Sequence, residues 1–254
     1  MRFAWLGSGS RGNAGLIEAG NTRLLLDCGF TAKETERRLA RLGLEPADLA
    51  GILVTHEHRD HIAGVSVLAR RHRLPVWMTP GTYRQAGDLG DLPELDLFSC
   101  HDPFAVGGLQ VEPFPVPHDA REPSQFVFSD GARRLGVLTD AGRCTPHMEA
   151  VLGGCDALLL ECNHDAGMLA EGPYPPALKA RVGGGHGHLS NDQAAELLGR
   201  LDTSGLQHVA ALHLSEENNR PGLAREALGA ALGCGPDWIQ AASQADGLDW
   251  RQLV

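Results

Sequence analysis

The sequence predicts an α+β fold in which two mixed β-sheets pack face to face and helices cover their outer surfaces. Short apolar segments typical of strands precede helical patterns in two similar halves of the chain. Residues that can bind metal follow several of these apolar segments directly, as expected where strand ends gather the ligands of a site. No repeat, low-complexity tract or linker divides the 254 residues, so we expect a single domain over residues 1–254.

The first half opens with strands joined by turns. A glycine-rich turn at 7–13 separates the first two strands, and Gly20-Asn21 closes a hairpin between the second and third. Apolar residues at helical spacing then alternate with a short buried strand. The expected segments are strands at 3–6, 16–19, 23–27 and 52–54, and helices at 33–42 and 61–72.

The second half repeats this order. Ser190 is suited to cap a helix whose first turn contains Asp192 and Gln193. Two further short strands are expected to close the chain. The other expected segments are strands at 109–116, 125–129, 135–139, 157–161 and 209–212, and helices at 145–152, 191–201 and 223–232.

Composition excludes several classes of protein. The formal net charge of −10 argues against nonspecific, charge-driven coating of nucleic acid, although a local basic groove is compatible with it. The six cysteines form no Cys-x-x-Cys pair, and we expect reduced thiols. The first residues reach Gly7 too early for a signal peptide, and no apolar run is long enough to span a membrane. We therefore expect a cytoplasmic protein without membrane contact.

The most informative segment is Thr55–His61, which reads T-H-E-H-R-D-H directly after the apolar residues Ile52–Val54. Three imidazoles and a carboxylate crowd the end of an expected buried strand. Buried polar groups of this kind need partners, and a bound cation supplies one. His118, Asp140 and His213 each follow another apolar segment, so we expect them at the same edge of the sheets.

This pattern resembles the metallo-β-lactamase superfamily, which implies an αββα four-layer sandwich. A structural zinc site, the alternative, usually has four ligands in one closed shell. The resemblance also implies that Asp27, at the end of Leu24–Leu26, supports the histidine-rich segment. It implies two metal sites, one held by His56, His58 and His118, the other by Asp60, His61 and His213, with Asp140 bridging them.

Four further segments narrow the resemblance to the YycJ/WalJ family, whose members are associated with 5′-to-3′ exonuclease action on DNA. These segments are Gly7–Asn13, Glu161–Asp165, Gly187–Asn191 and His213–Arg220. A more distant likeness to tRNase Z places Glu161 behind His188. The short intervals after His118 and after Asp140 leave no room for a tRNA-gripping arm or a β-CASP domain.

We therefore expect a metal-dependent phosphodiester hydrolase that uses two divalent ions, Zn²⁺ or Mn²⁺, and no organic cofactor. Asp60, His188 and Glu161 are the expected catalytic residues, and DNA is favoured over RNA as the substrate. Residues that could contact substrate are His164, Asn163, Arg121, Lys179, Arg181 and Arg220.

Two alternatives stay open. One is a hydrolase of small esters, lactones, thioesters or cyclic nucleotides, which an acidic surface and a compact body favour. The other is a metal-binding regulator without catalysis. The letters Gly7-x-Gly9-x-x-Gly12 match a dinucleotide fingerprint, but a strand rather than a helix is expected to follow, so we interpret them as a turn.

Overall fold

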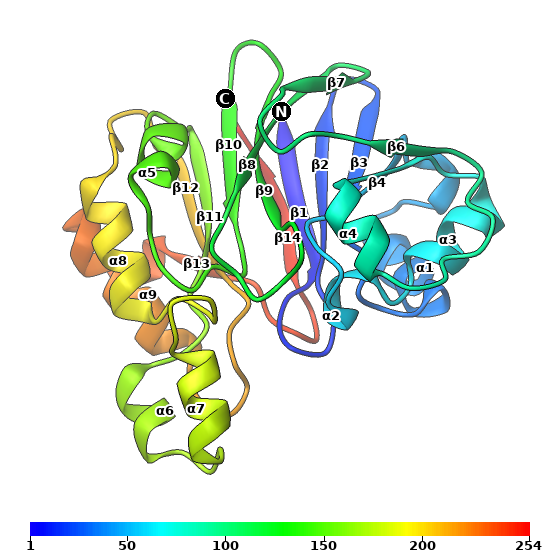
Figure 1. The fold of residues 1–254 in the computed structure, drawn as a ribbon. Helices are drawn as coiled ribbons and strands as arrows, with labels where there is room; N and C mark the ends of the chain where they lie inside the picture. The colour runs from blue at the N-terminus through cyan, green and yellow to red at the C-terminus, as the bar shows by residue number, and fades with distance from the viewer.

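A computed structural model describes residues 1–254 and contains two mixed sheets of seven strands each (Figure 1). The first sheet has the order β14-β1-β2-β3-β4-β5-β6 and the second β13-β12-β11-β10-β9-β8-β7. The sheets pack face to face and helices cover both outer surfaces. The predicted architecture is therefore confirmed.

The strands of the first sheet are β1 (Arg2–Gly7), β2 (Ala14–Ala19), β3 (Thr22–Leu26), β4 (Gly51–Leu53), β5 (Val76–Met78), β6 (Leu95–Leu97) and β14 (Leu248–Gln252). Those of the second are β7 (Phe104–Val106), β8 (Leu109–Pro115), β9 (Ser124–Ser129), β10 (Arg134–Leu138), β11 (Ala157–Glu161), β12 (His208–Leu212) and β13 (Gln240–Ala241).

The α-helices are α1 (Ala32–Arg41), α2 (Arg59–Ile62), α3 (Val65–His72), α4 (Pro80–Gln85), α5 (Pro146–Leu152), α6 (Ala166–Glu171), α7 (Pro176–Val182), α8 (Asn191–Arg200) and α9 (Pro221–Leu232). Short 3₁₀ turns lie at Pro46–Asp48 and Pro236–Trp238. No helix is both long and apolar enough to cross a bilayer.

Three apolar clusters hold the layers together. Phe3, Phe126 and Leu159 belong to the cluster buried between the two sheets. A second cluster packs α5, α8 and α9 against the second sheet, and a third packs α1 and α3 against the first. Burial of these surfaces is the main favourable term for the sandwich.

The strand directions bring the site together at one edge. β3 and β4 are parallel, as are β10, β11 and β12. β8 and β10 both pair antiparallel to β9, so they run in the same direction as each other. Parallel strands end at the same edge of a sheet, and the residues that follow these strands can therefore meet.

Two local features differ from the sequence prediction. The helix expected at 61–72 is interrupted between α2 and α3, where Gly64 donates its N–H to Cys28 O at 2.8 Å. A side chain at Gly64 would overlap the carbonyl of Phe30, so the chain packs too closely there for any larger residue. Elements such as β5, β6 and α7 were not predicted, because three-residue strands and short helices show too little periodicity.

Candidate metal centre and active-site cleft

Asp27 fixes the histidine-rich segment Thr55–His61 by hydrogen bonds from two of its residues. Its carboxylate accepts the Thr55 N–H at 2.8 Å and the Thr55 hydroxyl at 2.9 Å. The Nδ1–H of His61 donates to the same carboxylate at 2.7 Å. These bonds fix the loop after β4 and leave His61 Nε2 free to act as a ligand. The structure thus places Asp27 where the resemblance implied.

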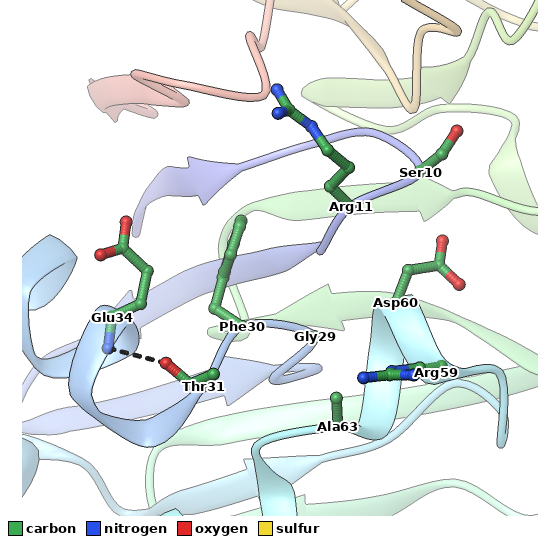
Figure 2. Close-up of a pocket in the computed structure, with 9 residues that line it drawn as sticks. All are labelled: Ser10, Arg11, Gly29, Phe30, Thr31, Glu34, Arg59, Asp60 and Ala63. Carbon is green, nitrogen blue, oxygen red and sulfur yellow. Dashed lines mark hydrogen bonds between the residues drawn. The ribbon is translucent and has the colours of Figure 1, made fainter.

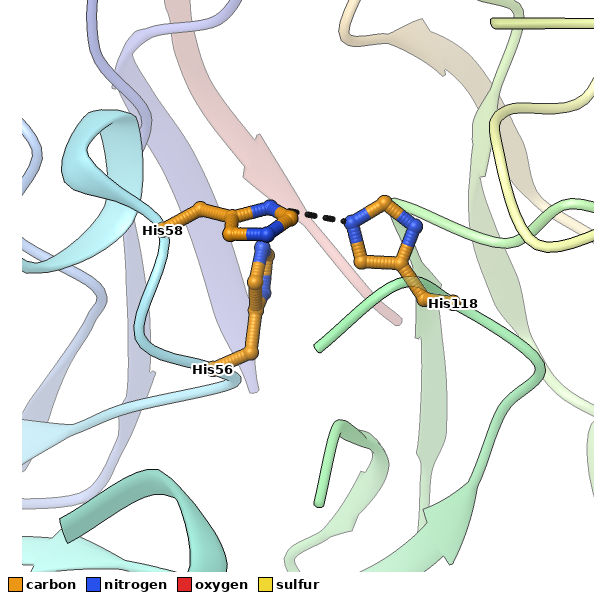
Figure 3. A group of neighbouring side chains, drawn as sticks. All are labelled: His56, His58 and His118. Atoms are coloured by element: carbon orange, nitrogen blue, oxygen red, sulfur yellow. Dashed lines mark hydrogen bonds between the residues drawn. The ribbon is translucent and has the colours of Figure 1, made fainter. Parts of the chain in front are cut away.

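His56, His58 and His118 form the first group of possible ligands, with one nitrogen of each ring within 4.8 Å of the others. Figure 3 shows the rings turned toward one another, with His56 and His58 on one side and His118 on the other. His118 donates its Nδ1–H to Gly187 O at 2.9 Å, which leaves Nε2 facing His58 Nδ1 at 3.1 Å. His56 and His58 follow β4 of the first sheet and His118 follows β8 of the second, so both sheets contribute to this group.

Asp60, His61 and His213 form the second group. His213 Nε2 lies 3.3 Å from Asp60 Oδ2, and His61 Nε2 lies 3.5 Å from the same oxygen. Asp140 stands between the two groups. Its Oδ2 is 3.1 Å from His61 Nε2, and its Oδ1 is 3.8 Å from His118 Nε2. The structure therefore gathers all the predicted ligands in one place.

The backbone at three of these residues is strained. Asp27, Asp140 and His213 have φ angles of 60°, 56° and 52°, a region that residues other than glycine rarely adopt. Each of the three closely follows the end of a strand, where a left-handed turn re-aims its side chain toward the site. Strain of this kind persists only where the surrounding structure holds it, and it is common at functional sites.

The donor set fits a metal. Thr55 already donates its hydroxyl to Asp27, so its oxygen accepts Nδ1–H of His56 at 2.9 Å. The other ring nitrogen, His56 Nε2, is buried and has no hydrogen-bond partner. An orphaned buried acceptor is costly, and a cation among three imidazole nitrogens would satisfy it. Burial lowers the pKa of His56 well below its ordinary value, so the ring is neutral as a ligand must be.

Carboxylates dominate the second group. Burial alone would lower the pKa of His61, but Asp140, Asp60 and Asp27 outweigh burial and hold that pKa well above its ordinary value. The pKa of His213 is raised in the same way, mainly by Asp140. A site that holds protons this firmly also attracts a cation in their place. The two clusters are consistent with a site for two metal ions.

Glu161 organises the second sheet's part of the site. Its Oε2 accepts the N–H groups of Ala141 and Leu189 at 2.9 and 3.0 Å, and its Oε1 accepts His188 Nδ1–H at 2.8 Å. His213 Nδ1 is 3.2 Å from the same oxygen. Burial raises the pKa of Glu161, but these partners overcome burial and lower it to about 2. The predicted pairing of Glu161 with His188 is therefore present in the structure.

His188 reaches the site because its loop packs tightly. A side chain at Gly187 would overlap the carbonyls of Arg181 and Val182, and His188 N donates to Val182 O at 2.8 Å. Only glycine allows the backbone to approach this closely at that position. Burial lowers the pKa of His188, but Glu161 and Asp140 outweigh burial and raise it above its ordinary value.

A cleft of about 350 Å³ opens over the two metal groups. His58, Asp60, Asp140, His188 and His213 lie on its floor and walls. Tyr174 and Leu178, from the projecting α6–α7 segment, form one wall and were not predicted from the sequence. No motif marks them, because their position depends on how α7 folds against the site.

The residues predicted to contact substrate divide into two sets. Arg181 lines the cleft and pairs with Asp119 at 2.6 Å, while Asn163 and His164 are buried beside it. Asn163 donates to His213 O at 3.0 Å, so it supports a possible ligand. Of the six, only Arg181 lines the cleft: Asn163 and His164 are buried behind it, and Lys179, which donates to Ala170 O at 2.6 Å, Arg121 and Arg220 lie outside it.

The sequence is similar to a known superfamily and to individual proteins of known activity. A sequence model of the β-lactamase superfamily domain matches residues 22–213. The chain is 38% identical to the exodeoxyribonuclease YycJ of Bacillus anthracis, over 91% of this chain and 89% of the relative. It is 34% identical to the exodeoxyribonuclease WalJ of Streptococcus pneumoniae, over 86% and 83%.

The fold is similar to that of solved structures as well. Zn²⁺-bound PqqB from Methylobacterium extorquens superimposes with a TM-score of 0.74 at 18% identity, and the alignment covers 100% of both chains. At this identity the similarity concerns the fold.

Proposed function

The chain belongs to the metallo-β-lactamase superfamily and is a metal-binding hydrolase of that fold, and from this premise we propose that it is a nuclease. Its substrate is DNA, which it degrades as an exonuclease in the 5′-to-3′ direction. The whole of residues 1–254 acts as one domain. Two ions, Zn²⁺ or Mn²⁺, occupy the groups described above.

The observation that carries this proposal is the extent of the similarity to two exodeoxyribonucleases. It runs over 91% and 86% of this chain and over most of each relative. The matched lengths leave little room for a separate domain that could supply the activity in the relatives. The geometry supports the proposal, because the predicted ligands are clustered, several of them line the cleft, and His188 lines it with Glu161 bonded behind it.

The bound ions supply an activated water and neutralise charge on the phosphate. The residues of the chain position the ligands and the reacting groups. Asp140 holds the two groups of ligands together, and Asp60 orients the attacking water by accepting a hydrogen bond from it. Asn163 and Asp27 keep His213 and His61 oriented through the bonds described above.

His188 acts as the general acid in this proposal. Because its Nδ1–H donates to Glu161, its Nε2 is the atom left to carry a proton toward the cleft. Proton transfer to the leaving oxygen removes the charge that develops there. Arg181, at the cleft wall, is placed to approach the substrate phosphate once it exchanges its contact with Asp119.

A nuclease assay tests the proposal. Metal-stripped protein is incubated with single-stranded DNA, duplex DNA and matched RNA, each labelled at one end, after Mn²⁺ or Zn²⁺ is restored. We expect stepwise loss of nucleotides from the 5′ end of DNA, and no loss with His58→Ala.

Two results of the same assay would contradict the proposed nuclease function. If every polymer stays intact while the protein binds metal and hydrolyses bis-p-nitrophenyl phosphate, the protein is a small-substrate phosphodiesterase instead. Metal binding without any hydrolysis would indicate a regulator.

A further inference from the structure

A second cavity, of about 530 Å³, adjoins the cleft on the far side of Asp60. Ser10, Arg59 and Asp60 line both spaces, so the two are continuous. Figure 2 shows Ser10 and Arg11 on one side of this cavity and Arg59 near its base. A strand that crosses the metal centre can therefore extend into it.

The glycine-rich turn between β1 and β2 forms one wall of this cavity. Asn13 fixes the turn internally by accepting Gly9 N–H at 2.9 Å, and its own N–H donates to Asp60 O at 2.7 Å. Ser8 Oγ accepts the His213 N–H at 2.8 Å. The turn is thus bonded to two members of the second ligand group, Asp60 and His213, and Ser10 is exposed beside them.

The cavity offers positive charge that the protein does not use. Arg59 is exposed and its guanidinium has no ion-pair or hydrogen-bond partner in the structure. Arg11 pairs with Glu216 at 2.7 Å, but both side chains are largely exposed, at 69% and 49%, and such a pair is easily exchanged.

Two carboxylates line the cavity: Asp60, whose Oδ2 faces His61 and His213 at the boundary with the cleft, and Glu34 on the far wall. Glu34 is held by Arg37 and Arg38, each at 2.7 Å. It therefore offers little repulsion to an anion in the cavity.

The lining suits a phosphate better than a nucleobase. The only aromatic ring there, Phe30, is 7% exposed, and the guanidinium of Arg38 covers one face at 4.0 Å from the ring centre. A base needs an open aromatic face to stack on. An unpaired arginine beside a hydroxyl is instead a common arrangement for phosphate binding.

We propose that this cavity binds a second phosphate of the substrate strand, next to the phosphate that is cleaved, with Arg59 as the main contact and Ser10 and Arg11 assisting. The inference rests on the nuclease function proposed above and names the element that recognises a polymer. The glycine-rich turn is then a substrate-binding element. A substrate with a single phosphate cannot use this site.

The test compares a polymer with a single-phosphate substrate. For Arg59→Gln we expect kcat/KM on an end-labelled oligonucleotide to fall about tenfold or more, and much less on bis-p-nitrophenyl phosphate. The salt dependence of oligonucleotide binding should also weaken by about one phosphate contact. Arg200→Gln, an exposed arginine of α8 far from the site, is the matched control and should change neither rate.

A second measurement locates the phosphate. Replacing single phosphates of the oligonucleotide with neutral methylphosphonates should slow the wild type most at a position adjacent to the cleaved bond. The same replacement should cause little further loss in Arg59→Gln, because the contact is already absent. Metal content is measured in each variant, so that loss of the neighbouring ligands is recognised.

The possible results distinguish failure of the second phosphate site from failure of the proposed nuclease function. Equal losses on both substrates, or no loss on the oligonucleotide, would overturn the phosphate site while the nuclease remains. A wild-type protein that leaves all polymers intact overturns the proposed function, and this inference with it.

Discussion

The two sheets supply the metal centre in different ways. The first sheet contributes His56, His58, Asp60 and His61 from one loop and the start of α2, directly after β4. The second sheet contributes His118, Asp140 and His213 from the ends of three strands, so their meeting depends on the pairing of β8 to β12. The ligands of the first sheet are therefore brought together by local structure, whereas those of the second sheet are brought together by the pairing of several strands.

Each sheet also places one buried carboxylate behind its ligands. Asp27 accepts from Thr55 and His61, yet burial outweighs these partners and raises its pKa. Glu161 has two imidazoles and two backbone N–H groups as partners, and its pKa falls to about 2 in spite of burial. Both carboxylates are buried, so the second imidazole beside Glu161 accounts for its lower pKa.

The largest effect is expected where the two parts meet. Asp140→Ala removes the only carboxylate that contacts both groups of ligands, so we expect loss of both ions and a fall in turnover of about a thousandfold or more. Metal analysis and the nuclease assay measure this directly. Retention of two ions by a folded variant, judged by circular dichroism, would show that Asp140 does not join the two parts.

Changing His188 should separate turnover from metal binding. We expect His188→Ala to lower kcat by about 10²–10⁴-fold, the usual contribution of a general acid, while metal content stays near that of the wild type. His101→Ala, an exposed histidine in the loop between β6 and β7, is the control. Loss of metal in His188→Ala would instead make His188 a ligand.

Acid stability should distinguish the two buried carboxylates. The pKa of Glu161 in the folded protein lies below its unfolded value, so its ionisation stabilises the fold above about pH 4.5, and this contribution disappears as the pH falls toward 2. In metal-free protein, Glu161→Gln should therefore flatten the loss of stability over this range by a few kcal/mol. Asp27→Asn should not, because the pKa of Asp27 is raised. Urea unfolding at several pH values gives the comparison, and equal profiles for both variants would remove the distinction.

At neutral pH, Asp27→Asn should weaken metal binding. Asparagine has one acceptor oxygen where aspartate has two, so it cannot accept from both the Thr55 N–H and His61, which bond different oxygens of Asp27. Loss of such support for a ligand typically costs about 10–100-fold in metal affinity. Competition with a chelator measures this affinity. Asp88→Asn, at an exposed position near the end of α4, should leave it unchanged. An unaltered affinity in Asp27→Asn would mean that the loop holds its shape without this support.

The smallest effect is expected at the start of α8. Ser190 caps this helix, as the sequence predicted, and also forms a reciprocal capping box with Gln193. Ser190→Ala should cost about 1 kcal/mol in urea unfolding and little in activity. A large loss of activity would show that the helix start positions His188 more strictly than we infer.

The contrast between the sheets also explains what the sequence could predict. Thr55–His61 is readable because the ligands are adjacent and the strand before them is apolar. His118, Asp140 and His213 were predicted to share an edge because each follows an apolar segment, but their division between two metal sites came from the resemblance. The sheet topology shows why they meet. Tyr174 and the cavity beside Arg59 carry no local pattern, since they arise where a projecting helix pair and a turn pack beside the site.

The most direct test of the account is a titration of metal-stripped protein with Mn²⁺ or Zn²⁺ while nucleotides released from 5′-labelled DNA are counted. If each sheet completes one group of ligands around Asp140, the rate should rise until two ions are bound per chain and then stay constant. A rate that reaches its maximum at one ion, or no release of nucleotides at any metal content, would contradict a two-metal nuclease.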